Sequence, residues 1–396
     1  MAFLSNRTRD YRYGLMRQLM DLEGLDALAF TSPDFFQFAT NFATDVQVWE
    51  RPIVCVVPRD GEPFVLLNEL STNHWRYGVE DNRLWVSDAS YYAEHPRVNS
   101  RQPLLPQWSE HVADLLAAHG LARARIGAEG LAGPFAKAVA LLPKARLEAP
   151  LKQIRSLRWV KNDEEIELMR QLSALSDWVQ DRYRENIRPG RAVHELDMAM
   201  ATLMGQEAAR RFPGENLEIL RCWTLSGPAS AAPHGDGRQI GATIEAGHGL
   251  INLIIPRLNG IVIENERTWF CGKPTSEQER YFEAARAANE AALEAAVVGH
   301  PVSGIDAAAQ TAIEKAGCAD YILHRTGHGM GTLGHEFPED MAFNHRRLLK
   351  NEVYSAEPGI YVYGLGGFRK DDTVVVGETP EVLTRSPGDL KSQTIL

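Results

Sequence analysis

Two carboxylates interrupt an apolar run near the middle of the chain. Residues 260–270 read GIVIENERTWF, in which Glu264, Asn265 and Glu266 stand among residues typical of a buried strand. A buried charge costs several kcal/mol unless it is paired or ligated. The run therefore predicts that another part of the chain, or something that the protein binds, partners these two acids.

Five further polar side chains interrupt segments that are otherwise rich in glycine or in strand-forming residues. They are His234 in SAAPHGDGR, His328 and His335 in TGHGMGTLGHEFP, Glu357 in SAEPGIY and Asp371 in GFRKDDTVVV. Imidazole exchanges protons near neutral pH, and carboxylates bind metal ions or organic cations. Such a set predicts a catalytic site that acts on a small molecule.

The elements that must position these groups fall into two segments, residues 1–157 and 158–396. In the first segment, periodic apolar residues predict a helix over residues 6–23 and another near 108–119. Two apolar runs on either side of residues 59–61 predict a β-hairpin. These signals predict a mixed α/β domain at the N-terminus.

The second segment begins with a helix start signal. Asn162 precedes a run of acids, which suits the positive end of a helix dipole. Ser276 and Glu279 have the spacing of a capping box and predict a long helix that ends near Val298. Further elements are expected as a helix at 303–316, a strand with His328, and strands at 353–363 and 368–377. A helix followed by strands occurs twice, which indicates two related halves and an α/β (α+β) class.

Composition excludes several classes of protein. The chain has 396 residues, of which 44% are hydrophobic, with a net charge of −10, as in a folded globular protein of two domains. No run of Lys and Arg is long enough to follow a phosphate backbone, so nucleic acid is not an expected partner. Neither a signal peptide nor a membrane span is indicated. The four cysteines are scattered, which predicts a reduced, cytoplasmic protein.

The order and local frames of these polar residues resemble the pita-bread family of methionine aminopeptidase, prolidase, aminopeptidase P and creatinase. The resemblance rests on the pattern GHGxG…HExP followed by EPGxY. It implies a pita-bread catalytic domain over residues 158–396. It also implies an N-terminal α/β domain of the creatinase and prolidase type over residues 1–157.

In the metallopeptidases of that family, five side chains hold two divalent metal ions. Carried over by position, those five places are occupied here by Leu253, Glu264, His328, Glu357 and Asp371. Leucine offers no lone pair, and strand alternation directs the neighbouring Asn252 to the opposite face. The resemblance therefore predicts that no metal is needed. The alternative is one ion of manganese, cobalt, iron or zinc on the other four side chains.

Other details resemble the metal-independent creatinase branch. These are Asn265-Glu266-Arg267-Thr268 where creatinases have LERT, Gly331-Thr332-Leu333, and Trp49-Glu50-Arg51-Pro52. The resemblance implies hydrolysis of an amidine, guanidino or amide C–N bond in a small zwitterion. It also implies a homodimer in which the N-terminal domain of one copy completes the site of the other.

Roles follow from the same resemblance. The predicted catalytic residues are His234, Glu266, Glu357, His335 and His328, and the predicted substrate-binding residues are Arg51, Trp49 and Glu264. His234 would act as general base on water and then as general acid to the leaving nitrogen. Glu266 and Glu357, left without metal, would hold a cationic substrate through charge-assisted hydrogen bonds.

Three other functions stay open from the sequence. The first is an Xaa-Pro metallopeptidase of the aminopeptidase P or prolidase type, which needs a divalent metal. The second is a lyase that acts on a small onium compound. The third is a module that binds peptide without catalysis. Metal content after purification separates the first of these from the creatinase-like hypothesis.

Overall fold

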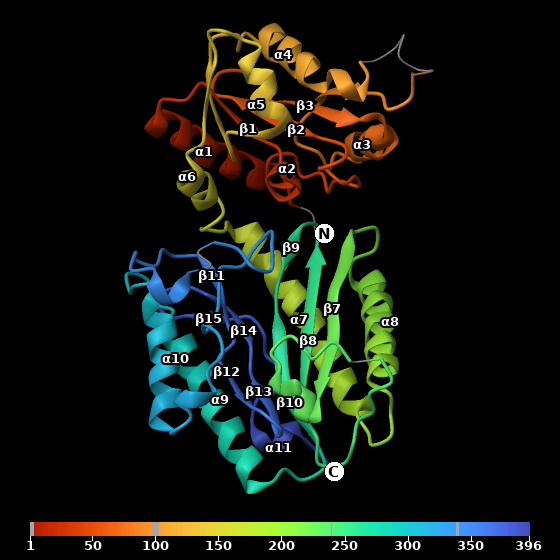
Figure 1. Cartoon of the computed structure of the whole chain (residues 1–396), viewed down its shortest axis with the longest axis vertical. Coiled ribbons are helices and arrows are strands. Elements are labelled where there is room, and N and C mark those ends of the chain that lie inside the picture. Colours follow the sequence, from red (N-terminus) through yellow and green to blue (C-terminus); the bar gives the residue numbers. More distant parts are fainter. Residues whose placement is uncertain (1–3, 97–102, 239, 338–339) are drawn as a thin grey trace. The chain divides into compact units, whose positions relative to one another are not determined.

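The computed structural model describes residues 4–96, 103–238, 240–337 and 340–396, and the chain divides between Leu157 and Arg158 into two compact units (Figure 1). Each unit is described by itself. Among the described residues, no helix is both long enough and apolar enough to cross a membrane.

The N-terminal unit is built on one mixed six-stranded sheet. Its strands, in spatial order, are β4 (Asp88–Tyr92), β3 (Phe64–Asn68), β2 (Val54–Pro58), β1 (Ala27–Phe30), β5 (Arg125–Ala128) and β6 (Arg146–Glu148). Its helices are α1 (Asn6–Glu23), α2 (Pro33–Thr40), α3 (Thr72–Glu80), α4 (Trp108–Ala118), α5 (Gly133–Ala140) and α6 (Leu151–Ser156). The predicted hairpin is confirmed as the antiparallel pair β2 and β3.

Both faces of this sheet are covered, because side chains alternate along a central strand. In β1, Leu28 and Phe30 belong to one apolar cluster, and Ala27 and Ala29 belong to a second cluster on the opposite face. All four residues are buried. The N-terminal unit therefore has a core of its own on each side of its sheet.

The C-terminal unit contains three sheets flanked by helices. One sheet has the order β16 (Thr394–Ile395), β10 (Asn265–Cys271), β8 (Gly249–Leu258) and β7 (Leu217–Ser226), with β9 (Ile261–Val262) paired to β8. The others are β11 (Val353–Ala356), β14 (Asp372–Val375) and β15 (Glu381–Val382), and the hairpin of β12 (Gly359–Val362) with β13 (Gly366–Arg369). The helices are α7 (Asp163–Asn186), α8 (Val193–Arg211), α9 (Ser276–Ala295), α10 (Ser303–Lys315) and α11 (Leu390–Gln393).

The helices of this unit pack as two pairs. Helices α7 and α8 contact the sheet of β7, β8 and β10, whereas α9 contacts β11, β12 and β13 and also packs against α10. Figure 1 shows these pairs on opposite sides of the strands. The repeated order of helices and strands agrees with the two related halves that the sequence indicates.

The N-terminal caps of helices α7 and α9 can be compared with those that the sequence predicts. Asn162 caps α7, as expected, and it also forms a capping box with Glu165. Helix α9 is capped by Thr275 with Gln278, one residue earlier than the predicted pair. The extended backbone of Thr275, with φ −74° and ψ 159°, lets its hydroxyl accept from the backbone N–H of Gln278.

The segment that carries His328 is not the regular strand that the sequence predicts. It is an irregular loop that meets β11 at single bridges, with the N–H of Ser355 donating to the carbonyl of His328 at 3.0 Å. A Cβ on Gly327 would lie 2.1 Å from the carbonyl oxygen of Ser355. Glycine is therefore required at this position, because only a residue without a side chain can approach β11 so closely.

Candidate functional site

The carboxylates of the site are brought together where two sheets meet. Glu264 precedes β10, Glu266 lies on it, Glu357 follows β11, and Asp371 lies between β13 and β14. The backbones of Glu266 and Asp371 exchange two hydrogen bonds, with N···O distances of 3.2 and 3.1 Å. This bridge joins one half of the unit to the other and places the acids from both halves around one point.

His328 lies between two of these acids. Its Nε2 is 3.5 Å from Oε2 of Glu264 and 3.4 Å from Oε1 of Glu357, and its side chain is fully buried. Its Nδ1 lies 3.1 Å from the carbonyl oxygen of Gly329. Because a carbonyl only accepts, Nδ1 carries a proton in this contact, and the Nε2 of a neutral ring would present its lone pair to the carboxylates.

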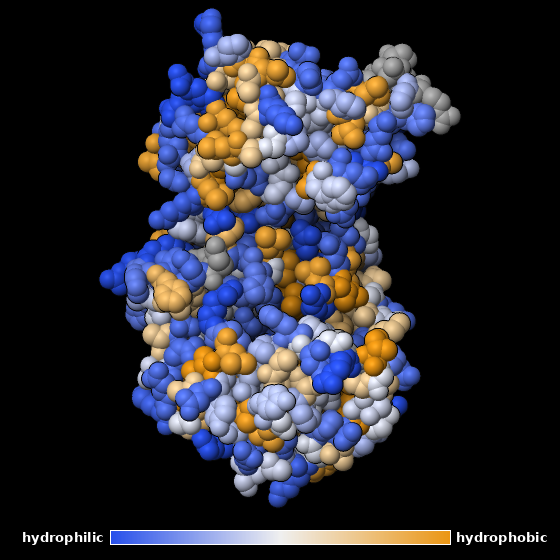
Figure 2. All heavy atoms as spheres, in the orientation of Figure 1, coloured by the Kyte–Doolittle hydropathy of each residue, from blue (hydrophilic) through white to orange (hydrophobic). Residues whose placement is uncertain are grey.

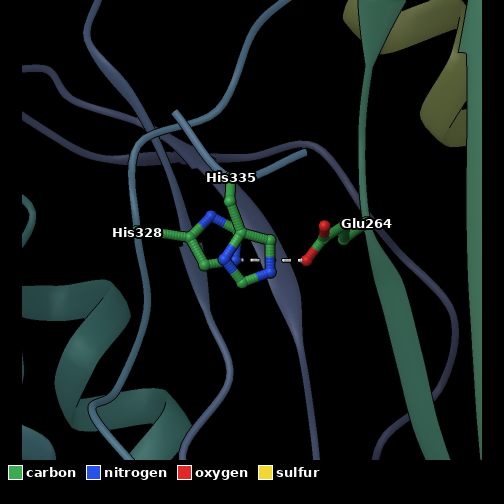
Figure 3. Close-up of side chains that lie close together, drawn as sticks. All are labelled: Glu264, His328 and His335. Carbon is green, nitrogen blue, oxygen red and sulfur yellow. Dashed lines mark ion pairs between the residues drawn. The ribbon is translucent and has the colours of Figure 1, made fainter. Parts of the chain in front are cut away.

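His335 stacks on His328. The ring centroids are 3.7 Å apart with an interplanar angle of 21°, and Figure 3 shows the carboxylate of Glu264 beside the stacked pair. Arg325 donates to Nδ1 of His335 at 3.3 Å, so the free Nε2 of a neutral ring carries the proton. Ligand atoms of Glu264, His328 and His335 lie within 4.8 Å of one another and could hold a metal ion.

Asp371 is a buried acid without a hydrogen-bond partner. Its side chain is fully buried, and among the described residues neither carboxylate oxygen accepts a hydrogen bond. Burial raises the pKa of Asp371 well above its ordinary value, and the negative charges of Glu266, Glu264 and Glu357 add to the rise. A carboxylate in this setting needs a cation to remain ionised.

Glu266 has a different partner. Its carboxylate forms an ion pair with the guanidinium of Arg369, in which Nη2 donates to Oε1 at 3.2 Å. Burial and the charges of Glu357 and Glu264 raise the pKa of Glu266 to about 8, although Arg369 opposes them. Glu266 is therefore the acid in this cluster that already has a strong basic partner within the chain.

The pKa values of Glu357 and His328 are shifted in opposite directions. Burial alone would raise the pKa of Glu357, but the hydrogen bond and charge of His328 lower it to about 2. Burial alone would lower the pKa of His328, but Glu264 and Glu357 raise it well above its ordinary value. In the absence of any other cation, His328 thus serves as the positive charge that these acids require.

The sequence did not single out His324, which lines the cavity of this site, or Tyr361, which contacts His324. Tyr361 accepts from Nη1 of Arg369 at 3.1 Å, and its hydroxyl lies 2.7 Å from Nε2 of His324. Burial lowers the pKa of His324. His324 comes shortly before His328 in the sequence, and Tyr361 follows the EPG frame. Both residues therefore lie next to motifs that the sequence analysis identifies.

A cavity of about 1010 Å³ opens onto these groups. Its polar lining includes His234, which is exposed, together with Glu264, Glu266, Glu357 and Arg369. Its larger apolar lining residues are Leu220, Trp223, Leu253, Ile255, Leu323 and Leu333. Figure 2 shows apolar surface over β7 and β8, the strands that supply most of this apolar lining.

Leu253 and Asn252 have the orientations that alternation predicts. Leu253 lines the cavity, whereas Asn252 is fully buried and donates to the hydroxyl of Thr224 at 2.6 Å. That hydroxyl in turn donates to Asp197. Asn252 is therefore committed to a network away from the site and does not replace the missing carboxylate.

Arg51 and Trp49 belong to the N-terminal unit. Arg51 pairs with Glu50 at 2.7 Å and also with Glu94, and the side chain of Trp49 is 82% exposed. Within this chain, the exposed ring of Trp49 and the ion pairs of Arg51 do not place either residue in the site. Their participation in the site of a second copy stays a prediction.

The donors that converge here fit a divalent metal ion. Glu264 and Glu357 flank His328, and His335 has a ligand atom within 4.8 Å of those of Glu264 and His328. The backbone bridge to Glu266 brings Asp371 to the same region. Carboxylate oxygens with imidazole nitrogen suit manganese, cobalt, iron or zinc. The contact of His328 with Gly329 orients the imidazole as in many metal sites. The unpartnered carboxylate of Asp371 is the observation that favours an ion most strongly.

Comparisons with known proteins agree with this chemistry. Residues 167–378 match metallopeptidase family M24. The chain is 31% identical over 238 residues to the putative dipeptidase YkvY of Bacillus subtilis, covering 60% of this chain and 63% of that one. It is 32% identical over 245 residues to the probable dipeptidase PepE of Mycobacterium tuberculosis, covering 62% of each. These matches therefore span less than two thirds of either relative.

A longer match and two solved structures extend the comparison. The Xaa-Pro dipeptidase of Lactobacillus helveticus is 26% identical over 386 residues, which cover 95% of this chain and 97% of that one. The dipeptidase PepE of Mycobacterium ulcerans shares the fold with a TM-score of 0.80, at 24% identity over 99% of both chains. The prolidase of Pyrococcus horikoshii does so with a TM-score of 0.77, at 20% identity over 96% of this chain and 99% of that one.

These findings correct two expectations. The prediction of a metal-independent, creatinase-like hydrolase is wrong, because the relatives are named dipeptidases and Xaa-Pro dipeptidases. The prediction that no metal is needed is wrong as well, because the family is one of metallopeptidases and the site contains a group that could hold an ion. The physical reason is that Leu253 removes one donor and leaves the others converging. The chain belongs to metallopeptidase family M24, and its C-terminal unit has the pita-bread fold of that family.

Proposed function

We propose that the chain is a divalent-metal-dependent dipeptidase that hydrolyses Xaa-Pro dipeptides. The observation that carries the proposal is the position of His328, with Nε2 between Glu264 and Glu357. The buried, unpartnered carboxylate of Asp371 supports it. The substrate class is taken from the relatives named Xaa-Pro dipeptidase, of which one matches almost the full length of the chain.

Glu264, His328, Glu357 and Asp371 would hold the ion. A bound divalent ion would supply Lewis-acid polarisation of the scissile carbonyl and would lower the pKa of a bound water, so that a nucleophile is available at neutral pH. The chain's own side chains do the rest. His335, with its Nε2 proton free, donates a hydrogen bond to a substrate oxygen, and His234 at the exposed side of the cavity carries protons to and from the solvent.

The cavity can accommodate both ends of a dipeptide. Its apolar wall, which includes Trp223, Leu253 and Ile255, suits an aliphatic or aromatic first side chain. Glu266 lines the same cavity, and we propose that it binds the protonated amino group of the substrate. Arg369 keeps the carboxylate of Glu266 in place for this contact.

The test of the function is hydrolysis of Ala-Pro and Leu-Pro by the full chain before and after removal of metal. Activity should fall to background after dialysis against a chelator and return when Mn²⁺ or Co²⁺ is added, since the four ligands organise the reacting groups only around a cation. Creatine serves as the control substrate. Chelator-treated, metal-free protein that cleaves Xaa-Pro dipeptides at its original rate would refute the proposal.

Glu266→Gln tests the contact with the amino group. The variant should raise KM for Ala-Pro by about tenfold or more, because a hydrogen bond to a charged group contributes roughly 1.5–3 kcal/mol. An analogue of Ala-Pro that lacks the amino group provides the control, and its kcat/KM should be the same for both proteins. An equal loss for both substrates would assign Glu266 a role in placing Arg369 instead.

A further inference from the structure

We infer that this site holds one divalent ion per chain, instead of the two that the related metallopeptidases are expected to bind. The inference rests on the proposed function and concerns the same pocket. Leu253 is the residue that decides it. Its side chain is 4% exposed and belongs to an apolar cluster with Leu225, Ile251 and Tyr361. Trp223 lies directly across the strand pair from it and packs against the same cluster.

Among the residues that the structure describes, the neighbours of Leu253 along and across the strands do not restore the donor that it lacks. Asn252 is directed to the opposite face of β8 and is held by Thr224. Glu266, on the strand paired with β8 and directly opposite Leu253, is held by Arg369. Beyond donors shared with the first ion, a second ion would gain only the imidazole of His335, whose ligand atom lies within 4.8 Å of those of Glu264 and His328, and hard divalent ions require more oxygen donors than that.

A second ion at Leu253 would also lie near a fixed positive charge. Glu266 is directly opposite Leu253 on the paired strand, and its carboxylate is paired with the guanidinium of Arg369. Like charges repel, so this guanidinium disfavours a further cation on that side of the pocket.

The geometry thus assigns the ion and the substrate's first side chain to different sides of the pocket. One ion is assigned to the side of the pocket formed by His328 and Glu357. The side formed by Leu253 and Trp223 is apolar and is assigned to the substrate's first side chain. Glu266 lies directly opposite Leu253 in the pairing of β8 with β10 and also lines the cavity, and it is assigned the contact with the amino group.

Metal stoichiometry tests the inference. The full chain is loaded with Mn²⁺, freed of excess ion, and analysed for manganese per chain by mass spectrometry and for spin coupling by electron paramagnetic resonance. The wild type should bind one ion and show the hyperfine pattern of an isolated Mn²⁺. Leu253→Asp should bind two ions with an exchange-coupled spectrum, whereas the matched control Leu253→Asn should still bind one.

The outcomes separate this inference from the proposed function. Two coupled ions in the wild type would overturn the inference and leave the metallopeptidase intact. No bound ion together with chelator-insensitive hydrolysis would overturn the function itself. A folded Leu253→Asp that binds a single ion would contradict the role assigned to Leu253. If that variant does not fold, the wild-type stoichiometry and spectrum still decide the matter.

Discussion

Glu357→Gln should reduce kcat/KM for Ala-Pro by about a thousandfold. The change removes one charged oxygen donor from the proposed ion site while keeping the size of the side chain. Lewis-acid assistance contributes several kcal/mol to such reactions, and each 1.36 kcal/mol lost from transition-state stabilisation is about tenfold in rate. His328 would also lose one of the two acids that it contacts.

The measurement is steady-state kinetics at saturating Mn²⁺, together with the affinity for Mn²⁺ by calorimetry. Glu378→Gln provides the control, because Glu378 is exposed and lies outside the cavity. Its kinetics should match the wild type. A Glu357→Gln variant with wild-type kinetics and unchanged affinity for Mn²⁺ would show that the acid of the EPG frame does not hold the ion.

Glu336→Gln should lower the free energy of unfolding of the C-terminal unit by about 3–5 kcal/mol. Glu336 is 1% exposed and pairs with Arg158 at 3.3 Å and with Lys161 at 3.4 Å. It also accepts from the backbone N–H of Thr332 at 2.8 Å. Removing the charge of Glu336 leaves buried positive charge uncompensated. This costs more free energy of unfolding than replacing the whole cluster by apolar residues would.

This cluster also anchors the loop that presents His335, the residue before Glu336. Denaturant unfolding of wild type and variant, followed by circular dichroism, measures the loss. Glu185→Gln is the control, because Glu185 forms an exposed pair with Arg182, and its effect should stay within about 0.5 kcal/mol. A Glu336→Gln variant as stable as that control would mean that the cluster contributes little.

The stabilisation by Glu336 should depend on pH with a definite sign. Burial raises the pKa of Glu336, but Arg158 and Lys161 outweigh it and lower the pKa below its ordinary value of 4.5. A group with a lowered folded pKa stabilises the protein fully above the unfolded value, and the effect disappears as pH falls through the folded value. The difference between wild type and Glu336→Gln should therefore be constant near pH 7 and shrink in acid.

Much of the fold could be predicted because its signals are local. Capping by Asn162, the hairpin of β2 and β3 and the helices α1, α4, α7 and α10 follow from short-range patterns. The segment of His328 forms a loop and not the strand that the sequence predicts, because its glycines allow close backbone contacts with β11, which is distant in the sequence. The register of β10 and the backbone bridge between Glu266 and Asp371 also depend on contacts between segments that are distant in the sequence.

The site could be located from sequence, but its chemistry could not. Leu253 at a ligand position favours a metal-free site when only the sequence is considered, although the sequence leaves open one ion on the other four side chains. What the sequence could not show is that Asp371 is buried without a partner and that Arg369 neutralises Glu266. These two facts separate the acids into one group that needs a cation and one acid that already has one.

The most direct test of the proposed ion site is the anomalous diffraction of crystals of the full chain grown with Mn²⁺. We expect one strong peak in the C-terminal unit, within bonding distance of Glu264, His328, Glu357 and Asp371. Crystals of active enzyme with no anomalous peak among these four side chains would contradict it.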